Sequence, residues 1–560
     1  MDKIWLKNYP ANTPEMITDE NVSLNDLFNN ACKKYADSKA FTCHNESITY
    51  QQTYAYVNNL AASLLKLGVA RGDRVAIVLP NVLQYPLAIF AILKIGGIVV
   101  NINPLYTANE IDYLLSDSGA KVVIILDIMA HKLNELYIKH NLEHVIITKV
   151  ADIYPFVKRT IFNFMIKYVK RLSVNYSYKA HSLRDLIGKN SSESEIPKVD
   201  ITPEDIAFIQ YTGATTGKPK GAMLLHRSIV SNLAQVRCWL DAQIKPLSNE
   251  VVIDALPLYH IFSLTANLFT FFFYGSENIM VPNPRDVKDL LSLLKSNKFT
   301  IFSALDTLYN HLLNSPEFVA TQFPSFKYSV AGGMPLRQSI ANEWTKVTGV
   351  IPVNCYGLTE ASPAVTMNKF SDAFDGSVGY PIPSTEVEIR DKDSGEILSI
   401  GQTGVIWIRG PQLMSGYWNN SEQTLLAMDK NGWFNTKDLG YFNEKGKLFL
   451  NGRQSEMIII SGFNVYPAEV ECVLDKIPEV KESAVIGMPD NNTGEAVVAF
   501  IVFKSGQHIE ESEIIHKCKK EIAGYKVPKH IYIADELPKT LIGKIDKVAL
   551  KKKCADTFHA

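Results

Sequence analysis

The stretch Tyr211-Thr-Gly-Ala-Thr-Thr-Gly-Lys-Pro-Lys-Gly221 directly follows a short apolar run, Ile206 to Gln210, that is typical of a buried strand. Glycines in such a loop let backbone N–H groups approach an anion, while threonine and lysine side chains add hydroxyl donors and positive charge. The stretch therefore predicts a phosphate-binding loop, although a polar surface turn has a similar composition. Its candidate ligands are Thr212, Gly213, Ala214, Thr215, Thr216, Gly217, Lys218 and Lys220.

The spacing within this loop disfavours a P-loop NTPase. A P-loop places four residues between its first glycine and a Gly-Lys pair, which Ser or Thr then follows. Here Gly213 and Gly217 enclose three residues, and Pro219 follows Lys218. Because proline is unfavourable inside a helix, we expect the loop to fold back as a turn.

Apolar runs alternate with helical patterns through the first half of the chain. Val75–Leu79, Val122–Leu126 and Val145–Thr148 are predicted to be buried parallel strands, with a helix over Tyr85–Ile95 between the first two. Strands separated by helices indicate α/β layers with right-handed crossovers. Further strands are predicted at residues 251–256, 279–281 and 328–331.

The character of the sequence changes near Leu450-Asn-Gly-Arg453. Beyond it we expect a helix from Pro467, a favoured first-turn residue, and a helix over 511–522. Strands are predicted at 457–460, 484–487 and 497–502, which completes a small α+β unit. The predicted fold class is therefore α/β, with a large N-terminal domain of layered sheets and helices (1–452) and a small α+β C-terminal domain (453–560).

The composition excludes several classes of protein. A chain of 560 residues with 46% apolar and 21% charged residues is an ordinary multidomain globular protein. The formal net charge of −1 gives no reason to expect nucleic acid as a partner. The 7 cysteines include no C-x-x-C pair, which favours free thiols in a reducing cytoplasm over disulfides or a zinc site. The sequence Met1-Asp-Lys-Ile-Trp-Leu-Lys has no apolar core, so no secretory signal is expected.

Two segments raise the question of membranes. Ala255 to Gly275 carries no charged side chain and is long enough to span a bilayer, but Pro257, His260 and Asn267 interrupt its apolarity. We interpret it as a buried helix that lines an apolar pocket. Residues 153–184 contain no acidic side chain and mix lysine and arginine with aromatic and aliphatic residues. This pattern fits a helix lying on anionic lipid, or a helix that packs one face on the core with its lysines in solvent.

The phosphate loop and six further blocks resemble the adenylate-forming enzymes, a family of acyl-CoA synthetases, luciferases and peptide-synthetase adenylation domains. The seven blocks occur in the family's order, and the resemblance covers nearly the whole chain, from roughly residue 25 to 553. The six further blocks are Leu256-Pro-Leu-Tyr-His260, Ala331-Gly-Gly-Met-Pro335, Tyr356-Gly-Leu-Thr-Glu360, Gly432-Trp-Phe-Asn-Thr-Lys-Asp438, Ser461-Gly-Phe-Asn-Val-Tyr-Pro467 and Gly543-Lys544.

The resemblance implies a ligase that works in two half-reactions. A carboxylate attacks the α-phosphate of ATP to give acyl-AMP and pyrophosphate, and coenzyme A then displaces AMP. ATP, Mg²⁺ and coenzyme A are the cofactors and cosubstrates that it implies. It also implies that the C-terminal domain is mobile. A carboxylate is already ionised near pH 7, so the first step needs positioning and charge stabilisation rather than a general base.

The same resemblance assigns roles to individual residues. Lys544 matches the lysine that bridges phosphate and carboxylate during adenylation, and Thr359 and Glu360 complete the catalytic set. For each block a bland alternative exists: a strand-end turn for Tyr356–Glu360, a tight turn for the glycine pair, and a solvated lysine in the basic tail for Lys544. The other lysines of that tail, Lys547 and Lys551–Lys553, are expected to be solvated. The implied nucleotide contacts are Gly332, Gly333, Tyr356 (adenine), Gly357, Asp438 and Arg453 (ribose); the implied Mg²⁺ ligands are Glu360 and Thr216; and the implied coenzyme A loop is Ser461, Gly462 and Phe463.

Several positions depart from the usual family pattern. Ala214 removes a hydroxyl from the loop, Lys437 replaces the glycine before Asp438, and Ser455 stands at the hinge, where Asp or Lys is typical. Gly452 replaces an Asp before Arg453, and Asn354-Cys355 precedes Tyr356 in place of Gln or Glu and Gly. These changes leave open whether the rate or the domain rotation is altered.

The block order and the phenylalanine-rich segment after His260 look most like bacterial long-chain acyl-CoA synthetases. We expect Phe262, Leu264, Leu268 and Phe269 to line an apolar acyl pocket, with His260 either orienting the acyl carboxylate or packing as an ordinary core histidine. A long-chain fatty acid, a membrane surface touched from the cytoplasm, and a homodimer are the expected partners. Alternatives are a medium-chain or aryl-CoA ligase, a fatty acyl-AMP ligase, and a non-catalytic lipid-binding protein of the same fold.

Overall fold

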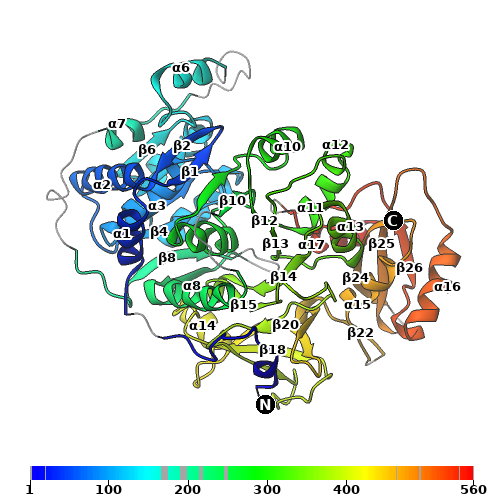
Figure 1. Cartoon of the computed structure of the whole chain (residues 1–560). Helices are drawn as coiled ribbons and strands as arrows, with labels where there is room; N and C mark the ends of the chain where they lie inside the picture. Colours follow the sequence, from blue (N-terminus) through cyan, green and yellow to red (C-terminus); the bar gives the residue numbers. More distant parts are fainter. Residues whose placement is uncertain are drawn as a thin grey trace.

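The computed structural model describes residues 3–18, 21–165, 175–188, 199–212, 218–244, 250–461, 463–490, 493–540 and 543–558. Two large sheets, one smaller antiparallel sheet and one C-terminal sheet account for the strands (Figure 1). The predicted fold class is confirmed: a large α/β body precedes a smaller α+β region, drawn in orange and red in Figure 1.

The sheet that ends at the phosphate loop is mainly parallel. Its central strands β4, β3, β5 and β6 pair in parallel, as expected for strands joined by crossover helices. β8 and β9 pair antiparallel around the loop, so the predicted fold-back at Pro219 is confirmed. In spatial order the strands are β19 (Gly416–Tyr417), β9 (Gly221–Leu225), β8 (Ile206–Tyr211), β4 (Ile98–Asn101), β3 (Arg74–Val78), β5 (Val122–Leu126), β6 (His144–Thr148) and β7 (His181–Ser182).

The second large sheet carries the nucleotide-side blocks at the ends of its strands. The predicted strand at 328–331 is confirmed as β13, and the strand predicted at 251–256 ends earlier, at Asp254. In spatial order the strands are β16 (Tyr380–Pro381), β15 (Ala364–Met367), β14 (Pro352–Gly357), β13 (Tyr328–Ala331), β12 (Ile301–Ala304), β10 (Val251–Asp254), β11 (Glu277–Met280), β1 (Lys39–Cys43) and β2 (Glu46–Thr49).

Two further sheets complete the molecule. An antiparallel sheet, β17 (Glu386–Arg390), β18 (Gly404–Arg409), β20 (Phe434–Phe442) and β21 (Leu448–Arg453), leads directly into the last one. We call residues 454–558 the C-terminal unit. Its sheet consists of β23 (Phe463–Val465), β22 (Ile458–Ile460), β25 (Gly494–Phe503), β24 (Val480–Asp490) and β26 (His530–Ile533).

Helices cover these sheets, and their termini follow local sequence signals. Ser23, Thr49 and Thr107 close capping boxes at the starts of α1, α2 and α4. The N-terminal helices are α1 (Leu24–Lys34), α2 (Tyr50–Lys66), α3 (Gln84–Lys94), α4 (Ala108–Ser118), α5 (Leu136–Lys139), α6 (Phe156–Phe164), α7 (Leu183–Ile187), α8 (His226–Asp241) and α9 (Thr270–Phe273). Those that follow are α10 (Val287–Ser296), α11 (Asp306–Leu313), α12 (Pro316–Val319), α13 (Gln338–Thr348), α14 (Ser421–Ala427), α15 (Pro467–Leu474), α16 (Glu511–Glu521) and α17 (Lys547–Phe558). Short 3₁₀ turns lie at η1 (Ile4–Asn8), η2 (Asp127–Leu133), η6 (Thr359–Ala361), η7 (Gln454–Glu456) and η8 (Gly524–Lys526).

The apolar segment 255–275 is buried, as predicted, but much of it is not an α-helix. It forms a π-helix, η5 (Phe262–Phe269), which continues into α9. The ring of Phe272 stacks on those of Phe41 and Tyr50 in the core, at centroid distances of 5.3 and 4.6 Å. Across the described residues, no helix combines the length and the apolar character that a bilayer crossing requires.

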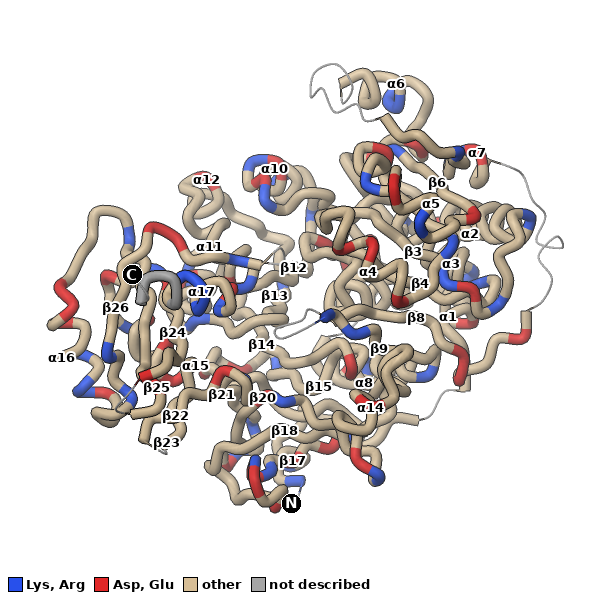
Figure 2. Tube along the Cα trace, turned by 180° about the vertical axis from the view of Figure 1, so that it is seen from behind, with Lys and Arg blue, Asp and Glu red and all other residues tan. Residues whose placement is uncertain are grey.

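The C-terminal unit carries both basic and acidic residues along its chain (Figure 2), and a basic residue of the body contacts it. Arg337, just before α13, donates to the Asp306 carboxylate at 2.6 Å and also to the backbone carbonyl of Lys481 in β24 at 2.5 Å. Both Arg337 and Asp306 are largely buried, so this ion pair belongs to the body, with one donor left over for the C-terminal unit.

Candidate active site

A cleft of ≈ 1690 Å³ lies between the body and the C-terminal unit. Residues from the sequence blocks line it together with segments that the blocks do not include. The block residues that line it are Thr212, Lys218, Lys220, His260, Phe262, Gly333, Tyr356, Gly357, Thr359, Glu360, Asp438, Arg453 and Lys544.

Asp438 is the centre of the predicted ribose contact. Its Oδ2 accepts a 2.6 Å hydrogen bond from the Tyr356 hydroxyl, and its Oδ1 lies 3.0 Å from Nε of Arg453. Burial raises the pKa of Asp438, while the neighbouring Arg453 guanidinium opposes that rise. The strands β20 and β21 set this geometry, because Asp438 and Arg453 are directly paired in their register. A carboxylate has about four lone-pair sites, so it can still accept from ribose hydroxyls.

Lys544 enters the cleft from the C-terminal unit. Gly543 before it has φ +87°, a left-handed conformation that glycine adopts readily, and Thr540 closes the turn by donating its N–H to the Lys544 carbonyl at 2.7 Å. Burial and the nearby Arg453 lower the pKa of Lys544, although Asp438 and Glu456 act in the opposite direction. The lysine is therefore held among fixed charges rather than solvated in the tail.

His260 lines the same cleft as Lys544 and belongs to the body. It is half-buried, and its Nδ1 accepts a hydrogen bond from the Phe262 N–H at 3.3 Å. Burial, with a smaller contribution from Lys544, lowers the pKa of His260 to about 4. The imidazole is consequently neutral at physiological pH, with Nδ1 occupied as an acceptor and Nε2 left as the donor.

The structure describes the phosphate loop at its two ends, Thr212 and Lys218–Lys220. The Thr212 N–H donates to the Lys220 carbonyl at 3.0 Å, which closes the base of the loop. Lys220 lies over the Tyr417 ring at 4.3 Å, and the Tyr417 hydroxyl donates to Glu360 at 2.7 Å. Lys218 lies over the ring of Tyr113 at 5.4 Å. Gly213, Ala214, Thr215, Thr216 and Gly217 lie outside the described residues.

Three glycines keep the walls of the nucleotide end close together. A Cβ on Gly357 would lie 2.1 Å from the carbonyl oxygen of Pro363, and one on Gly332 would lie 2.9 Å from Sγ of Cys355. Gly333 has φ +77°. Side chains at these positions would displace backbone or fill the cleft, which explains the glycines of two of the sequence blocks.

The other end of the cleft is an apolar chamber between α8, η5 and strands β12 to β15. Its walls combine a stripe at four-residue spacing on α8 with residues of the π-helix and the sheet. The prediction that Leu264, Leu268 and Phe269 line this pocket is wrong, because the π-helical winding turns them into the core. The chamber is lined by Val236, Leu240, Ile244, Phe262, Ala266, Asn267, Phe271, Val330, Met367 and Phe370.

The coenzyme A loop is not part of the cleft in this arrangement. Ser461 and Phe463 do not line the cleft; Phe463 is 57% exposed and packs against Tyr525 at 5.0 Å between ring centroids. Gly462 lies outside the described residues. The structure thus brings Lys544 to the nucleotide end and leaves the coenzyme A loop away from it.

The residues that depart from the family pattern at the nucleotide end affect the charge, backbone and packing around them. Burial and then the charge of Lys437 lower the pKa of Lys220. Gly452 has φ +98° and open space where a side chain would lie, and Ser455 is exposed in η7. Cys355 is half-buried in the cleft wall, where its Sγ donates to the Ala331 carbonyl at 3.1 Å.

One prediction for the basic tail is wrong. Lys547 is not solvated, because its Nζ lies 2.8 Å from Glu471 and 3.2 Å from Glu456, both within the C-terminal unit. Sequence spacing gives no signal for this bridge, since its two carboxylates are 76 and 91 positions away.

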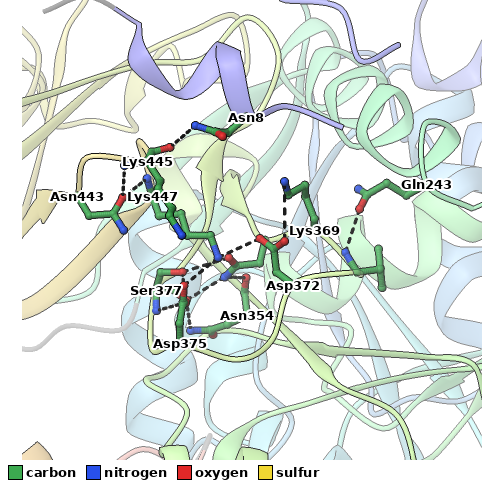
Figure 3. A network of polar contacts seen from close by, with 12 residues as sticks. Asn8, Gln243, Asn354, Lys369, Asp372, Asp375, Ser377, Asn443, Lys445 and Lys447 are labelled. Atoms are coloured by element: carbon green, nitrogen blue, oxygen red, sulfur yellow. Dashed lines mark hydrogen bonds and ion pairs between the residues drawn. The ribbon is translucent and has the colours of Figure 1, made fainter. Parts of the chain in front are cut away.

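A second polar network supports the chamber wall from behind (Figure 3). Lys447 is largely buried and pairs with Asp372 and Asp375, each at 2.9 Å. Asp375 also accepts from the Ser377 hydroxyl at 2.5 Å; burial opposes the shift, but these partners hold the pKa of Asp375 below its usual range. The network fixes the segment 368–377, from which Phe370 reaches the chamber.

Comparisons with known proteins agree with this geometry. The model of the AMP-binding enzyme family matches residues 28–418, and that of the AMP-binding enzyme C-terminal domain matches residues 469–544. The chain is 43% identical over 549 residues, 97% of each chain, to the long-chain-fatty-acid–CoA ligase of Escherichia coli O157:H7. It is 34% identical to the protein of the same name from Bacillus subtilis strain 168, over 100% of this chain and 99% of that one.

Solved structures of this family superpose on nearly the whole chain. ATP-bound MatB from Rhodopseudomonas palustris is 28% identical, with a TM-score of 0.79 over 96% of this chain and 100% of that one. A fatty acyl CoA synthetase of Mycobacterium tuberculosis is also 28% identical, with a TM-score of 0.68 over 96% and 99% of the two chains. The fold, the cleft and both family models lead to one assignment: this chain belongs to the AMP-binding enzyme family, the adenylate-forming enzymes that its seven blocks resemble.

Proposed function

We propose that the protein activates long-chain fatty acids to acyl-AMP and then transfers the acyl group to coenzyme A. The observation that carries the proposal is the meeting of Lys544, Asp438, Arg453 and His260 in one cleft that continues into an apolar chamber. Relatives that bear the name long-chain-fatty-acid–CoA ligase, at 38–43% identity over nearly their full length, support the choice of acid.

In the first half-reaction a carboxylate oxygen attacks the α-phosphorus of ATP, the new O–P bond forms, and the bond to the pyrophosphate oxygen breaks. Asp438 and Arg453 hold the ribose, the Tyr356 ring lies against adenine, and the loop from Thr212 to Lys220 holds the phosphates. The Lys544 ammonium sits where charge gathers on the phosphate oxygens, and Thr359 donates to the α-phosphate. His260 orients the acyl carboxylate through Nε2, because its Nδ1 is already occupied.

In the second half-reaction the thiolate of coenzyme A attacks the acyl carbonyl and AMP leaves. Ser461, Gly462 and Phe463 are proposed to meet coenzyme A, which requires the C-terminal unit to turn, because Phe463 does not line the cleft in this arrangement. The boundary between residues 1–452 and 453–560 is part of this proposal. β21 ends at Arg453, and the exposed Ser455 follows it, so rotation there breaks no buried contact of Ser455.

A magnesium ion fits the nucleotide end through Glu360, with Thr216 as the second proposed ligand. Among the described residues, no group of three or more His, Cys, Asp or Glu side chains could enclose a metal. Mg²⁺ bound through one or two protein oxygens plus substrate phosphates needs no such cage. When bound, the ion supplies positive charge to the phosphates, and the Tyr417 hydroxyl orients the Glu360 carboxylate for it.

The test supplies ATP, Mg²⁺, palmitate and coenzyme A to the purified protein. Palmitoyl-CoA, AMP and pyrophosphate in equal amounts are expected. Acyl-AMP without thioester would identify a fatty acyl-AMP ligase instead. Absence of pyrophosphate with every acid offered would leave a non-catalytic lipid-binding protein.

We also propose that this protein works in the cytoplasm and touches lipid surfaces through α6. The helix projects from the body (Figure 1), and Phe156, Val157, Ile161 and Phe164 on it are 60–71% exposed. Lys158 and Arg159 lie on the same helix, with Lys158 paired to Glu46, and Phe162 packs on Tyr154. The segment 166–174, which continues the basic pattern, lies outside the described residues.

Vesicle binding tests this surface. A variant with Phe156→Ser and Ile161→Ser should lose binding to anionic vesicles, and added salt should weaken binding by the native protein. Leu425→Ser on α14 is the matched control, because Leu425 is 79% exposed on a different face without a basic pattern. Equal binding by all three proteins would refute the surface. The predicted homodimer is tested by light scattering, which should return twice the 62.6 kDa of one chain.

A further inference from the structure

The amide of Asn267 is an anomaly in the acyl chamber. Its side chain is 1% exposed and lines the cleft, yet neither Oδ1 nor Nδ2 has a hydrogen-bond partner among the described residues. Leaving a buried polar group unpaired is unfavourable, so native proteins rarely keep one without a ligand or water for it.

Other polar side chains in the chamber wall do not share this property. The Thr366 hydroxyl donates to the Val378 carbonyl at 2.6 Å, and Asn354 Nδ2 donates to the Ser377 carbonyl at 3.0 Å. Both groups are turned into the protein and satisfied there. Asn267 alone among these three presents an amide with both its donor and its acceptor unused.

The local backbone gives a second, independent indication of a binding function. Asn267 lies in η5, an eight-residue π-helix. Such π-helical turns are rare in proteins overall, and those that occur are often found at functional sites. The wider winding turns Leu264 and Leu268 into the core and leaves Ala266 and Asn267 on the cleft wall. The segment therefore departs from α-helical geometry where it places an amide in an apolar chamber.

We propose that Asn267 forms a subsite for a hydroxyl group carried on the acyl chain, so that hydroxylated fatty acids are substrates. This inference rests on the proposed function and adds a substrate class to it. An unsubstituted alkyl chain offers no partner to the amide, whereas a hydroxyl can accept from Nδ2 or donate to Oδ1. The apolar residues around the amide, such as Val236, Leu240 and Phe271, exclude most competing water from the remaining wall.

The experiment compares palmitate with a series of its monohydroxy isomers, each hydroxylated at one position along the chain. The readout is kcat/KM for pyrophosphate release with saturating ATP, Mg²⁺ and coenzyme A. At one position or a short run of positions, the hydroxy acid should be preferred by roughly 3- to 10-fold over its neighbours in the series, the size of one hydrogen bond. In Asn267→Leu the ratio of kcat/KM for the preferred hydroxy acid to kcat/KM for palmitate should fall to the ratio of its neighbours in the series.

Thr265→Val is the matched control. Thr265 lies on the same π-helix and is also fully buried with an unpaired hydroxyl, but it does not line the cleft. Its removal should leave the preference unchanged. Thermal unfolding of each variant separates a loss of folding from a loss of selectivity.

The outcomes distinguish the two levels of the proposal. No turnover of palmitate by the native protein would overturn the proposed function itself. Turnover of palmitate with a featureless positional series, or a preference that survives Asn267→Leu, would overturn the subsite and show that the amide holds water only. If Asn267→Leu fails to fold, a featureless native positional series still overturns the subsite.

Discussion

The two ends of the cleft differ in the polarity of the side chains that line them. At the nucleotide end, each of two carboxylates has a partner before any substrate arrives: Asp438 has Tyr356 and Arg453, and Glu360 has Tyr417. At the acyl end the walls are apolar, and the amide of Asn267 has no partner. The first end is organised to receive charge, and the second is organised by exclusion of water.

This difference predicts how each end should respond to substitution. Removing a charge from the nucleotide end leaves its former partner buried and unpaired, so large kinetic losses are expected. Changing the volume of the acyl end should redistribute activity among acids without abolishing it.

Lys544→Ala should have the largest effect. It removes the cation that the C-terminal unit brings to the phosphate, so formation of acyl-AMP should fall on the order of 10²- to 10³-fold. Thioester formation from supplied acyl-AMP should be nearly unchanged. Pyrophosphate release and thioester yield measure the two steps separately, with the exposed Lys552→Ala as control. Equal losses in both steps would contradict the assigned role.

Asp438→Asn should come next. The neutral amide breaks the pairing with Arg453 and weakens the ribose contact, so KM for ATP should rise roughly 10- to 100-fold. KM for the fatty acid should stay near its native value. Asp393→Asn, at an exposed carboxylate outside the cleft, should change neither constant. An unchanged KM for ATP in Asp438→Asn would place the ribose elsewhere.

Ala266→Leu tests the acyl end. The added methyl groups project into the chamber and should lower kcat/KM for palmitate roughly tenfold while sparing acids a few carbons shorter. Ala234→Leu on α8 adds the same volume at a half-buried site that does not line the cleft. A uniform loss of kcat/KM over all acyl chain lengths would show that Ala266 does not determine the chain-length preference.

The smallest expected effect is a shift in a pH profile. Burial and Arg453 lower the pKa of Lys544, and only its protonated form can stabilise the phosphate. Adenylation should therefore decline on the alkaline side at a pH below that of an ordinary lysine, whose pKa is about 10.4. At saturating ATP, Arg453→Gln removes a repelling cation and should move this decline to higher pH. Arg409→Gln, at an exposed ion pair, should not move it.

Much of the fold and of the nucleotide end could be predicted from local sequence. Strands such as Val122–Leu126 are continuous apolar runs, and glycines such as Gly333 mark backbone that side chains would block. The pattern failed where tertiary geometry decides. In the π-helix η5, Leu264, which was expected to line the pocket, lies in the core, and a periodicity of 3.6 residues per turn cannot show this winding.

Ion pairs between residues far apart in the chain could not be predicted from local sequence either. The bridge from Lys547 to Glu456 and Glu471 and the pairing of Lys447 with Asp372 and Asp375 join residues far apart in the chain. A lysine in a basic run has the same local sequence whether it is solvated or buried. The partner is set only when the sheets are assembled.

Arg337 affects how easily the C-terminal unit can separate from the body and bind to it again. Its bond to Asp306 lies wholly within the body, while its bond to the Lys481 carbonyl crosses to the C-terminal unit. On departure Arg337 loses this neutral acceptor, which water can replace, and also the longer-range attraction of Asp475 and Glu482 in the C-terminal unit. It keeps its ion pair with Asp306, so the guanidinium is not left unpaired while the C-terminal unit is away.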